Sequence, residues 1–290
     1  MTEQIAVYGK GGVGKSTLTS NLSAALVEAG FSVLQVGCDP KGDSCSLLNN
    51  GVPIPTVFDL LREQGDISVD SVIHEGFKGI TCVELGDPFD SGGCGSAEIA
   101  RALEHLKRID LFEAIAPDFV LYDISGDSSC SSFHAPIQQL GVSRVFVVTT
   151  ADYMSLHAAN AIFRMLERYG ESNVTVPVGG LIPNSIASSF EESFIADFAA
   201  QTRTRTLGRI PRSLMVRQCE LYGKTVIEAS PISNQSYFYR RLANQIVDEV
   251  HSQASVSVPL RPEELRAWAR EWGDRIYALE NGLVTDGAAI

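Results

Sequence analysis

The chain has 290 residues, of which 44% are hydrophobic and 20% charged, a composition typical of a globular protein with one large domain or two small ones. Acidic residues outnumber basic ones by 35 to 23, so the formal net charge is −12. This balance argues against nucleic acid or an anionic membrane surface as a partner, because both kinds of binding depend on Lys and Arg. The sequence has no apolar run of about 18 residues and no basic-then-apolar segment at its start. We therefore expect a cytoplasmic protein without a membrane span.

A glycine-rich segment lies between an apolar run at 5–8 and a run at 17–26 with apolar residues at helical spacing. It matches the phosphate-loop pattern G-x-x-x-x-G-K-S/T and reads Gly9-Lys10-Gly11-Gly12-Val13-Gly14-Lys15-Ser16. Such glycines let backbone N–H groups turn toward one phosphate, and the helix N-terminus adds a partial positive charge. We expect Lys15 to reach the β- and γ-phosphates and Ser16 to bind Mg2+. The extra Lys10 resembles the deviant Walker A signature, in which this lysine reaches the nucleotide of the facing subunit in a dimer.

Acidic residues follow two further runs that we interpret as buried strands. The run at 32–38 leads into Asp39 and Asp43, and the run at 119–123 ends in Asp123. Carboxylates beyond the carboxyl ends of parallel strands point at the ligand crevice, so these groups are candidates to act on Mg2+ and on an attacking water. Asp123 resembles the carboxylate of a Walker B strand, which acts on Mg2+ through water. The alternative is that Asp39 and Asp43 only stabilise a turn.

Six cysteines are present, and none forms a C-x-x-C pair that would indicate a metal site within one subunit. Cys94 lies in a glycine-rich loop directly before a helical pattern, where a helix N-terminus stabilises a thiolate. Cys130 lies in the loop after Asp123, so we expect phosphate-dependent movement at Asp123 and Asp127 to reach it. The remaining four are expected to be core thiols: Cys38, Cys45, Cys82 and Cys219.

Strand and helix patterns alternate, which predicts the α/β class: a doubly wound, mostly parallel sheet with helices on both faces. The predicted strands are 5–8, 32–38, 79–85, 119–123, 142–149 and 176–183. The predicted helices are 17–26, one around 57–61, 99–109, 154–169 and 237–251.

We assign residues 1–255 to one phosphate-loop ATPase domain, which includes both loop cysteines, and residues 256–290 to a C-terminal amphipathic helix and tail. The apolar positions of that helix are Leu265, Trp268, Trp272, Ile276 and Leu279. Their helical spacing predicts packing on the same domain or on the second subunit of a dimer.

Taken together, these motifs resemble the nitrogenase iron protein family, which includes the L and X subunits of the chlorophyll-pathway reductases. The matching segments are YGKGGVGKS, VGCDPKGDS, the GGCGS loop around Cys94, YDISGDSSCSSF and KTVIEASP. The resemblance implies an ATP-dependent electron-transfer component. It also implies a homodimer with one 4Fe-4S cluster, to which Cys94 and Cys130 of each subunit contribute. Residues 1–255 would then be a phosphate-loop ATPase and iron–sulfur domain.

The resemblance also implies roles for individual residues. Nucleotide binding, hydrolysis and switching would involve Lys10, Lys15, Ser16, Thr17, Asp39, Lys41, Asp43, Asp123 and Asp127. The adenine pocket would involve Asn184, Pro211 and Gln235. The implied partners are a heteromeric, nitrogenase-like catalytic component and, as electron donor, ferredoxin or flavodoxin.

The chain departs from nitrogenase iron proteins at Ala97, where they have an arginine, and at Ser131 and Ser132, where they usually have glycines. By elimination these departures favour a methylthio-alkane reductase, which reduces small organic sulfides. The alternatives are the iron protein of a chlorophyll-pathway reductase, of a nickel-tetrapyrrole reductase or of nitrogenase.

Two interpretations from other classes remain. One is a cluster-free deviant Walker A ATPase of the chromosome-partitioning or division-site type. It is opposed by the net charge and by the two loop cysteines, because that class predicts a basic surface or a basic membrane-targeting helix. The other is a carrier for metal-cluster assembly, which is opposed by the missing C-x-x-C pair.

Overall fold

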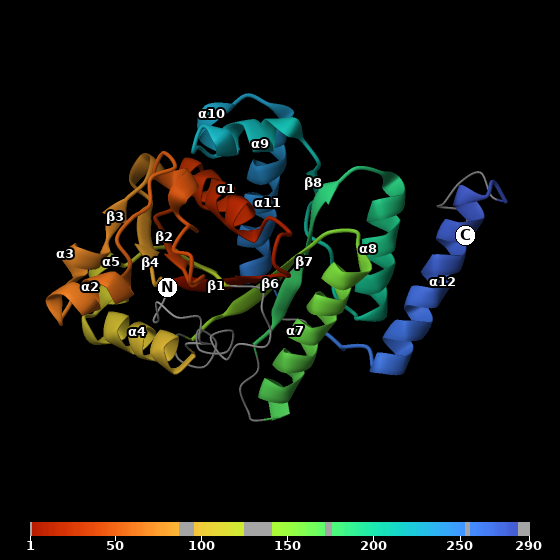
Figure 1. The fold of residues 1–290 in the computed structure, drawn as a ribbon, viewed down its shortest axis with the longest axis horizontal. Coiled ribbons are helices and arrows are strands. Elements are labelled where there is room, and N and C mark those ends of the chain that lie inside the picture. Colours follow the sequence, from red (N-terminus) through yellow and green to blue (C-terminus); the bar gives the residue numbers. More distant parts are fainter. Residues whose placement is uncertain (1, 87–95, 125–140, 172–175, 253–255, 284–290) are drawn as a thin grey trace.

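The computed structural model describes residues 2–86, 96–124, 141–171, 176–252 and 256–283, and Figure 1 shows its fold. A central sheet carries helices on both of its faces (Figure 1). The predicted α/β class is confirmed. Among the described helices, none is long and apolar enough to cross a membrane.

Within the described residues, eight strands form one sheet in the order β3-β4-β2-β5-β1-β6-β7-β8. Their bounds are β1 Glu3–Tyr8, β2 Val33–Gly37, β3 His74–Glu75, β4 Thr81–Glu84, β5 Phe119–Asp123, β6 Arg144–Thr149, β7 Val178–Ile186 and β8 Ile210–Pro211. The pairs are parallel except that β3 runs antiparallel to β4. In this register Val7 and Gly37 both pair with Asp123, so the carboxyl ends of β1, β2 and β5 lie together.

The described helices are α1 Lys15–Glu28, α2 Val57–Gln64, α3 Val69–Val72, α4 Ser96–Arg108, α5 Leu111–Ile115, α7 Tyr153–Glu171, α8 Ser189–Gln201, α9 Leu214–Leu221, α10 Val226–Ala229, α11 Asn234–Val250 and α12 Pro262–Glu280, with 3-10 turns η1 Ser46–Leu48 and η2 Phe77–Gly79. Successive side chains of a strand point to opposite faces of the sheet, so β1 contributes to two cores. Ile5 and Val7 pack in the core with α1, α10 and α11. Ala6 and Tyr8 pack in the other core, with α4, α7 and α8.

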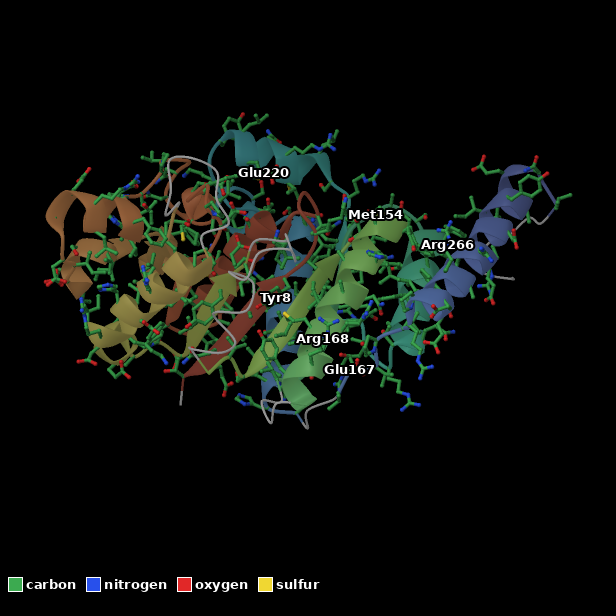
Figure 2. All side chains as sticks on the ribbon, turned by 60° about the horizontal axis from the view of Figure 1, so that its bottom comes forward. Tyr8, Met154, Glu167, Arg168, Glu220 and Arg266 are labelled. Atoms are coloured by element: carbon green, nitrogen blue, oxygen red, sulfur yellow. The ribbon has the colours of Figure 1, made fainter. Side chains whose placement is uncertain are left out.

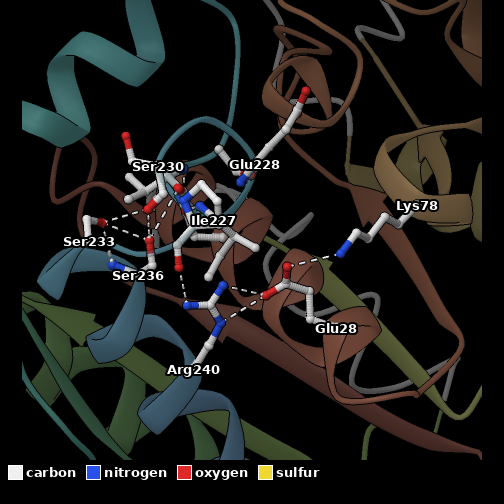
Figure 3. Close-up of polar contacts among 12 residues, drawn as sticks. Glu28, Lys78, Ile227, Glu228, Ser230, Ser233, Ser236 and Arg240 are labelled. Atoms are coloured by element: carbon white, nitrogen blue, oxygen red, sulfur yellow. Dashed lines mark hydrogen bonds and ion pairs between the residues drawn. The ribbon is translucent and has the colours of Figure 1, made fainter.

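The end of α1 is fixed by one carboxylate, Glu28. Its Oε1 accepts from Lys78 Nζ at 3.0 Å, and its Oε2 accepts from Arg240 Nε at 2.9 Å (Figure 3). Partial burial raises the pKa of Glu28, but the hydrogen bonds and charges of Arg240 and Lys78 outweigh burial and lower it. Because Arg240 lies on α11 and Lys78 on η2, this contact holds α1 to two segments distant in sequence.

At its C-terminal end the chain packs on α8 through two indole rings. Trp268 and Trp272 each donate from Nε1 to Asp197 Oδ2 at 2.7 Å. The ring of Phe194 lies 5.0 Å from that of Trp268 and 5.1 Å from that of Trp272, measured between centroids. The amphipathic helix is therefore confirmed, and this part of its apolar face is buried on its own chain. Ile276 is 43% exposed, and contact with a second subunit stays a prediction.

Each predicted strand and helix is present, with ends shifted by a few residues. The sequence analysis predicted no strand at β3 and no helix at α3, α5, α8, α9 or α10. The two residues of β3 are too few to show a pattern. In α8, by contrast, a capping signal was available, since Ser188 Oγ accepts from Glu191 N at 3.2 Å.

Replacing Asp197 by alanine should leave two buried indole N–H groups without their acceptor. We expect Asp197→Ala to lower the free energy of unfolding by about 2 kcal/mol, and Asp197→Asn, which keeps an acceptor, to cost less. Urea unfolding measures both. The matched control is Asp248→Ala, at an exposed aspartate on α11. A loss in Asp197→Ala no larger than in this control would contradict the assignment.

Candidate nucleotide site

The glycine-rich loop packs closely against residues of β6 and β7. Gly9 has a φ of 152°, and a Cβ at this position would lie 2.4 Å from the Val148 carbonyl oxygen on β6. Gly14 has a φ of 86°, and a Cβ there would lie 2.6 Å from Asn184 Nδ2 on β7. The same Asn184 Nδ2 donates to the Val13 carbonyl oxygen at 2.7 Å. Backbone conformation and close packing therefore both require glycine at these two positions.

A cavity of about 760 Å3 lies against this loop. Of the predicted site residues it brings together Gly11, Gly12, Gly14, Lys15, Ser16, Thr17, Asp39, Lys41 and Asp43. The Lys15 side chain is drawn inward, with only 8% of the residue exposed. The cavity thus combines the loop and first turn of α1 with the acidic segment that follows β2.

Asp123 lies beside this cavity at the end of β5 and is 1% exposed. Ser44 Oγ donates to its Oδ2 at 2.7 Å. Burial raises the pKa of Asp123, whereas hydrogen bonds from Ser16 and Ser44 and the charge of Lys15 act against that rise. The carboxylate predicted to act on Mg2+ is thus in contact with the residue predicted to bind it.

Ser44 is itself fixed by a buried network that the sequence analysis did not anticipate. Gln35 Nε2 donates to the carbonyl oxygen of Ser44 at 3.0 Å and to its Oγ at 3.1 Å. Ser20 Oγ donates to the same carbonyl at 2.9 Å, and Ser23 Oγ donates to Gln35 Oε1 at 2.7 Å. The network joins α1 and β2 to the acidic loop and fixes the position of that loop.

A second cavity of about 250 Å3 adjoins the first and shares Gly12, Gly14, Thr17 and Glu220 with it. Two residues predicted for the adenine pocket, Asn184 and Pro211, line it, as do Ser213 and Arg217. The third predicted residue, Gln235, is buried next to the lining and donates from Nε2 to the Pro211 carbonyl oxygen at 3.3 Å.

Glu220 is a functional candidate that the sequence analysis missed. It extends from α9 on the phosphate-loop side of the molecule (Figure 2) and lines both cavities. Thr17 Oγ1 donates to its Oε1 at 2.6 Å. Because α9 was not predicted, nothing in the local pattern marked this carboxylate.

Glu84 is a second missed carboxylate. It ends β4 and is 1% exposed. Its Oε1 accepts from Cys45 N at 2.5 Å, whereas its Oε2 is buried without a hydrogen-bond partner in the described part of the chain. Burial raises the pKa of Glu84 to about 8, against the lowering effect of the Cys45 hydrogen bond, and the nearby charges of Asp123 and Asp43 add to the rise. The available signal was its place at the carboxyl end of an apolar strand, as for Asp123.

The four cysteines expected in the core are buried free thiols: Cys38, Cys45, Cys82 and Cys219. Cys94, Cys130 and Asp127 lie outside the described residues. Within the described ranges, no group of three or more His, Cys, Asp or Glu is placed to hold a metal ion.

Two observations fit a magnesium nucleotide at the first cavity. A Cβ at Gly11 would meet no atom within 4 Å, and its φ is not in the left-handed region, so the fold itself does not require glycine there. Close approach of a phosphate to the backbone gives a reason for glycine at that position. Asp123 Oδ1 is buried without a partner among the described residues, and Mg2+ or a water on Mg2+ would supply one.

A phosphate loop between a parallel strand and a helix, with acidic residues at the ends of the neighbouring strands, defines a P-loop nucleotide-binding protein. Solved structures of this fold include the cell division ATPase MinD of Pyrococcus furiosus, with a TM-score of 0.66 and 21% identity over 86% of this chain and 99% of that one. Cobyrinic acid a,c-diamide synthase of Mycobacterium smegmatis, with a bound ATP analog and magnesium, has a TM-score of 0.67 and 19% identity over 90% of this chain and 100% of that one. At these identities the likeness shows the fold alone.

Sequence comparison identifies the family. The model of the 4Fe-4S iron sulfur cluster binding proteins, NifH/frxC family, matches residues 3–274. The chain is 45% identical to nitrogenase iron protein 2 of Paenibacillus durus, over 99% of this chain and 97% of that protein. It is 40% identical to the nitrogenase iron protein of Methanospirillum hungatei, over 93% of this chain and 96% of that protein. The chain therefore belongs to the NifH/frxC family of 4Fe-4S cluster-binding proteins.

The raised pKa of Glu84 predicts how stability changes with pH. Between its ordinary value of 4.5 and about 8 the folded protein keeps a proton that the unfolded chain releases, so stability falls as pH rises through this range. Relative to Glu84→Gln, which does not titrate, we expect the wild-type protein to lose about 2 kcal/mol of unfolding free energy between pH 5.5 and pH 7.5. Urea unfolding at fixed protein concentration tests this. A difference between the two proteins that does not vary with pH would contradict the raised pKa.

Proposed function

We propose that this chain is the ATP-dependent reductase component of a nitrogenase-like enzyme. In this role it passes single electrons from a 4Fe-4S cluster, shared by two copies of the chain, to a heteromeric catalytic component. The observation that carries the proposal is the cavity between the glycine-rich loop and the acidic loop after β2, in a chain of the NifH/frxC family. The cavity supports the phosphate site of the proposal, and membership of the family supports the cluster.

Each group of residues around the cavity has its own role in nucleotide binding. The backbone of the loop and Lys15 would hold the phosphates, and Ser16 would hold Mg2+. Asp123 would act on Mg2+ through water, and Asp39 and Asp43 would orient the attacking water. Magnesium would supply positive charge beside these three carboxylates, of which Asp123 is buried, Asp39 half-buried and Asp43 exposed.

The remaining predicted nucleotide residues follow from the same arrangement. Thr17 and Lys41 line the phosphate cavity. Lys10 would reach the nucleotide of the second copy. The second cavity, which Asn184 and Pro211 line, would hold the adenine base. Gln235 acts there through the Pro211 carbonyl that it contacts.

For the cluster we propose Cys94 and Cys130 as ligands. The other four cysteines are buried in the two cores, which leaves these two residues per chain. Two copies related by a two-fold axis then provide the four thiolates that such a cluster needs. Asp127 lies in sequence between Asp123 and Cys130 and would respond to the nucleotide together with them.

The catalytic component is the finer part of the proposal. We infer a methylthio-alkane reductase, which reduces small organic sulfides, from the residues Ala97, Ser131 and Ser132 that depart from nitrogenase iron proteins. Ferredoxin or flavodoxin would supply electrons in the cytoplasm. Affinity purification of the partner tests this: reduction of a small organic sulfide by the combined proteins supports it, and reduction of dinitrogen or of a tetrapyrrole instead would refute it.

The iron content tests the reductase role itself. Anaerobically purified wild-type protein should hold about four iron atoms per dimer, and Cys94→Ser and Cys130→Ser should each lose them, because each removes two of the four ligands. Iron quantitation after gel filtration measures this. The matched control is Cys219→Ser, at a buried core thiol, which should keep its iron. Wild-type protein that stays free of iron after anaerobic reconstitution would leave a cluster-free ATPase as the better account.

A further inference from the structure

Glu84 lies where two segments of the site meet, the loop after β2 and the end of β4. In the parallel register of these strands it is paired with Gly37. A Cβ on Gly37 would lie 1.9 Å from Glu84 Oε2 and 2.8 Å from its Oε1. The absence of a side chain at Gly37 therefore makes room for this carboxyl group over β2.

Two hydrogen bonds and one peptide unit lead from Glu84 to Asp123. Cys45 N donates to Glu84 Oε1 at 2.5 Å, and Cys45 directly follows Ser44. Ser44 Oγ in turn donates to Asp123 Oδ2 at 2.7 Å. The preceding residue, Asp43, lines the phosphate cavity. One carboxyl group thus holds the stretch of chain that places Asp43 and Ser44 at the nucleotide.

The surroundings of Glu84 indicate that its burial lowers the stability of the fold. The charged groups that act on it are acidic: Asp43 on the same loop as Cys45, and Asp123 at the end of β5. The thiols of Cys45, in that loop, and of Cys38, after β2, also feel its charge. A buried carboxyl group with an unpartnered oxygen and no cation among these groups costs stability that an apolar side chain would not. Such groups are typical of functional sites.

We propose that Glu84 is a positioning residue that ties the acidic loop after β2 to the end of β4. A shift of that loop when nucleotide binds is then passed to the chain leading to Cys94. Only Leu85 and Gly86 separate Glu84 from the segment 87–95 that contains this cysteine. The inference rests on the proposed function, because it needs both the nucleotide and the cluster.

The test uses the anaerobically purified, iron-loaded homodimer and two measurements. Calorimetric titration gives the affinity for MgATP, and the rate of iron release to a bipyridyl chelator, with and without MgATP, gives the nucleotide effect on the cluster. In Glu84→Leu, which removes the acceptor, the affinity should stay within about threefold and the nucleotide effect should fall about tenfold. Glu84→Gln keeps an oxygen that accepts from Cys45 N and should keep most of the effect.

A second variant disturbs the hydrogen bond between Cys45 N and Glu84 from β2. In Gly37→Ala the new methyl group displaces the Glu84 carboxyl group, so this variant should behave like Glu84→Leu, and it decides the question if Glu84→Leu does not fold. The matched control is Glu249→Leu, on α11. Glu249 is another buried carboxylate: its Oε1 has no hydrogen-bond partner among the described residues, and its Oε2 accepts from Arg205. This control should keep the wild-type nucleotide effect.

A full nucleotide effect in both Glu84→Leu and Gly37→Ala would overturn the inference. So would an equal loss in Glu84→Gln, since the hydrogen-bond acceptor would then not be what matters, or an equal loss in Glu249→Leu. Failure of the proposed function looks different, because it occurs in the unmutated protein: wild type without iron, or with iron but without a response to MgATP, overturns both together.

Discussion

The hydrogen bond from Ser44 to Asp123 joins the acidic loop after β2 to the end of β5, and the shape of the nucleotide site depends on it. It forms because β1, β2 and β5 are parallel neighbours, which brings Asp123 beside Gly37 and Val7 in one register. The phosphate loop follows β1 and the acidic loop follows β2. Because β5 lies between these two strands, the Asp123 side chain at its end can reach both loops. Gln35 and Ser20 then hold Ser44 from the core side.

This arrangement gathers carboxyl groups in a buried place. Burial raises the pKa of Asp123 and of Glu84. The charge of Asp123 adds to the rise at Glu84, and the charge of Asp39 adds to the rise at Asp123. In the described residues the inward-drawn Lys15 is the cation that acts on Asp123. Ordinary packing does not explain such a concentration of carboxyl groups, because apolar residues would be more stable there. A divalent cation that arrives with the nucleotide explains it, and the same cation would change how firmly the acidic loop is held.

Much of this fold was open to prediction because its signals are local. The period of apolar residues located β1, α1 and α12, and the phosphate-loop pattern located Lys15 and Ser16. The residues that escaped prediction act through contacts distant in sequence. Gln35 looks like an interruption of an apolar strand until Ser44 and Ser23 are placed beside it.

The same holds for the missed carboxylates and for α8. In the sequence Glu220 is one acidic residue among others, and its role is recognised only from the hydrogen bond that Thr17, 203 positions away, donates to it. Glu84 reads as the polar end of a strand until its partner Cys45 is known. The helix α8 carried a local signal in its Ser188 cap. Its aromatic residues, by contrast, are explained only by the packing of Trp268 and Trp272 on this helix.

The central claim is that nucleotide binding in the phosphate cavity is coupled to the iron–sulfur cluster. Electron paramagnetic resonance of the dithionite-reduced protein, recorded with and without MgATP, tests it most directly. The account predicts a 4Fe-4S signal whose shape changes with MgATP in wild type and stays unchanged in Lys15→Ala, where the phosphates lose their cation. A cluster signal that is the same in wild type with and without MgATP would contradict the account.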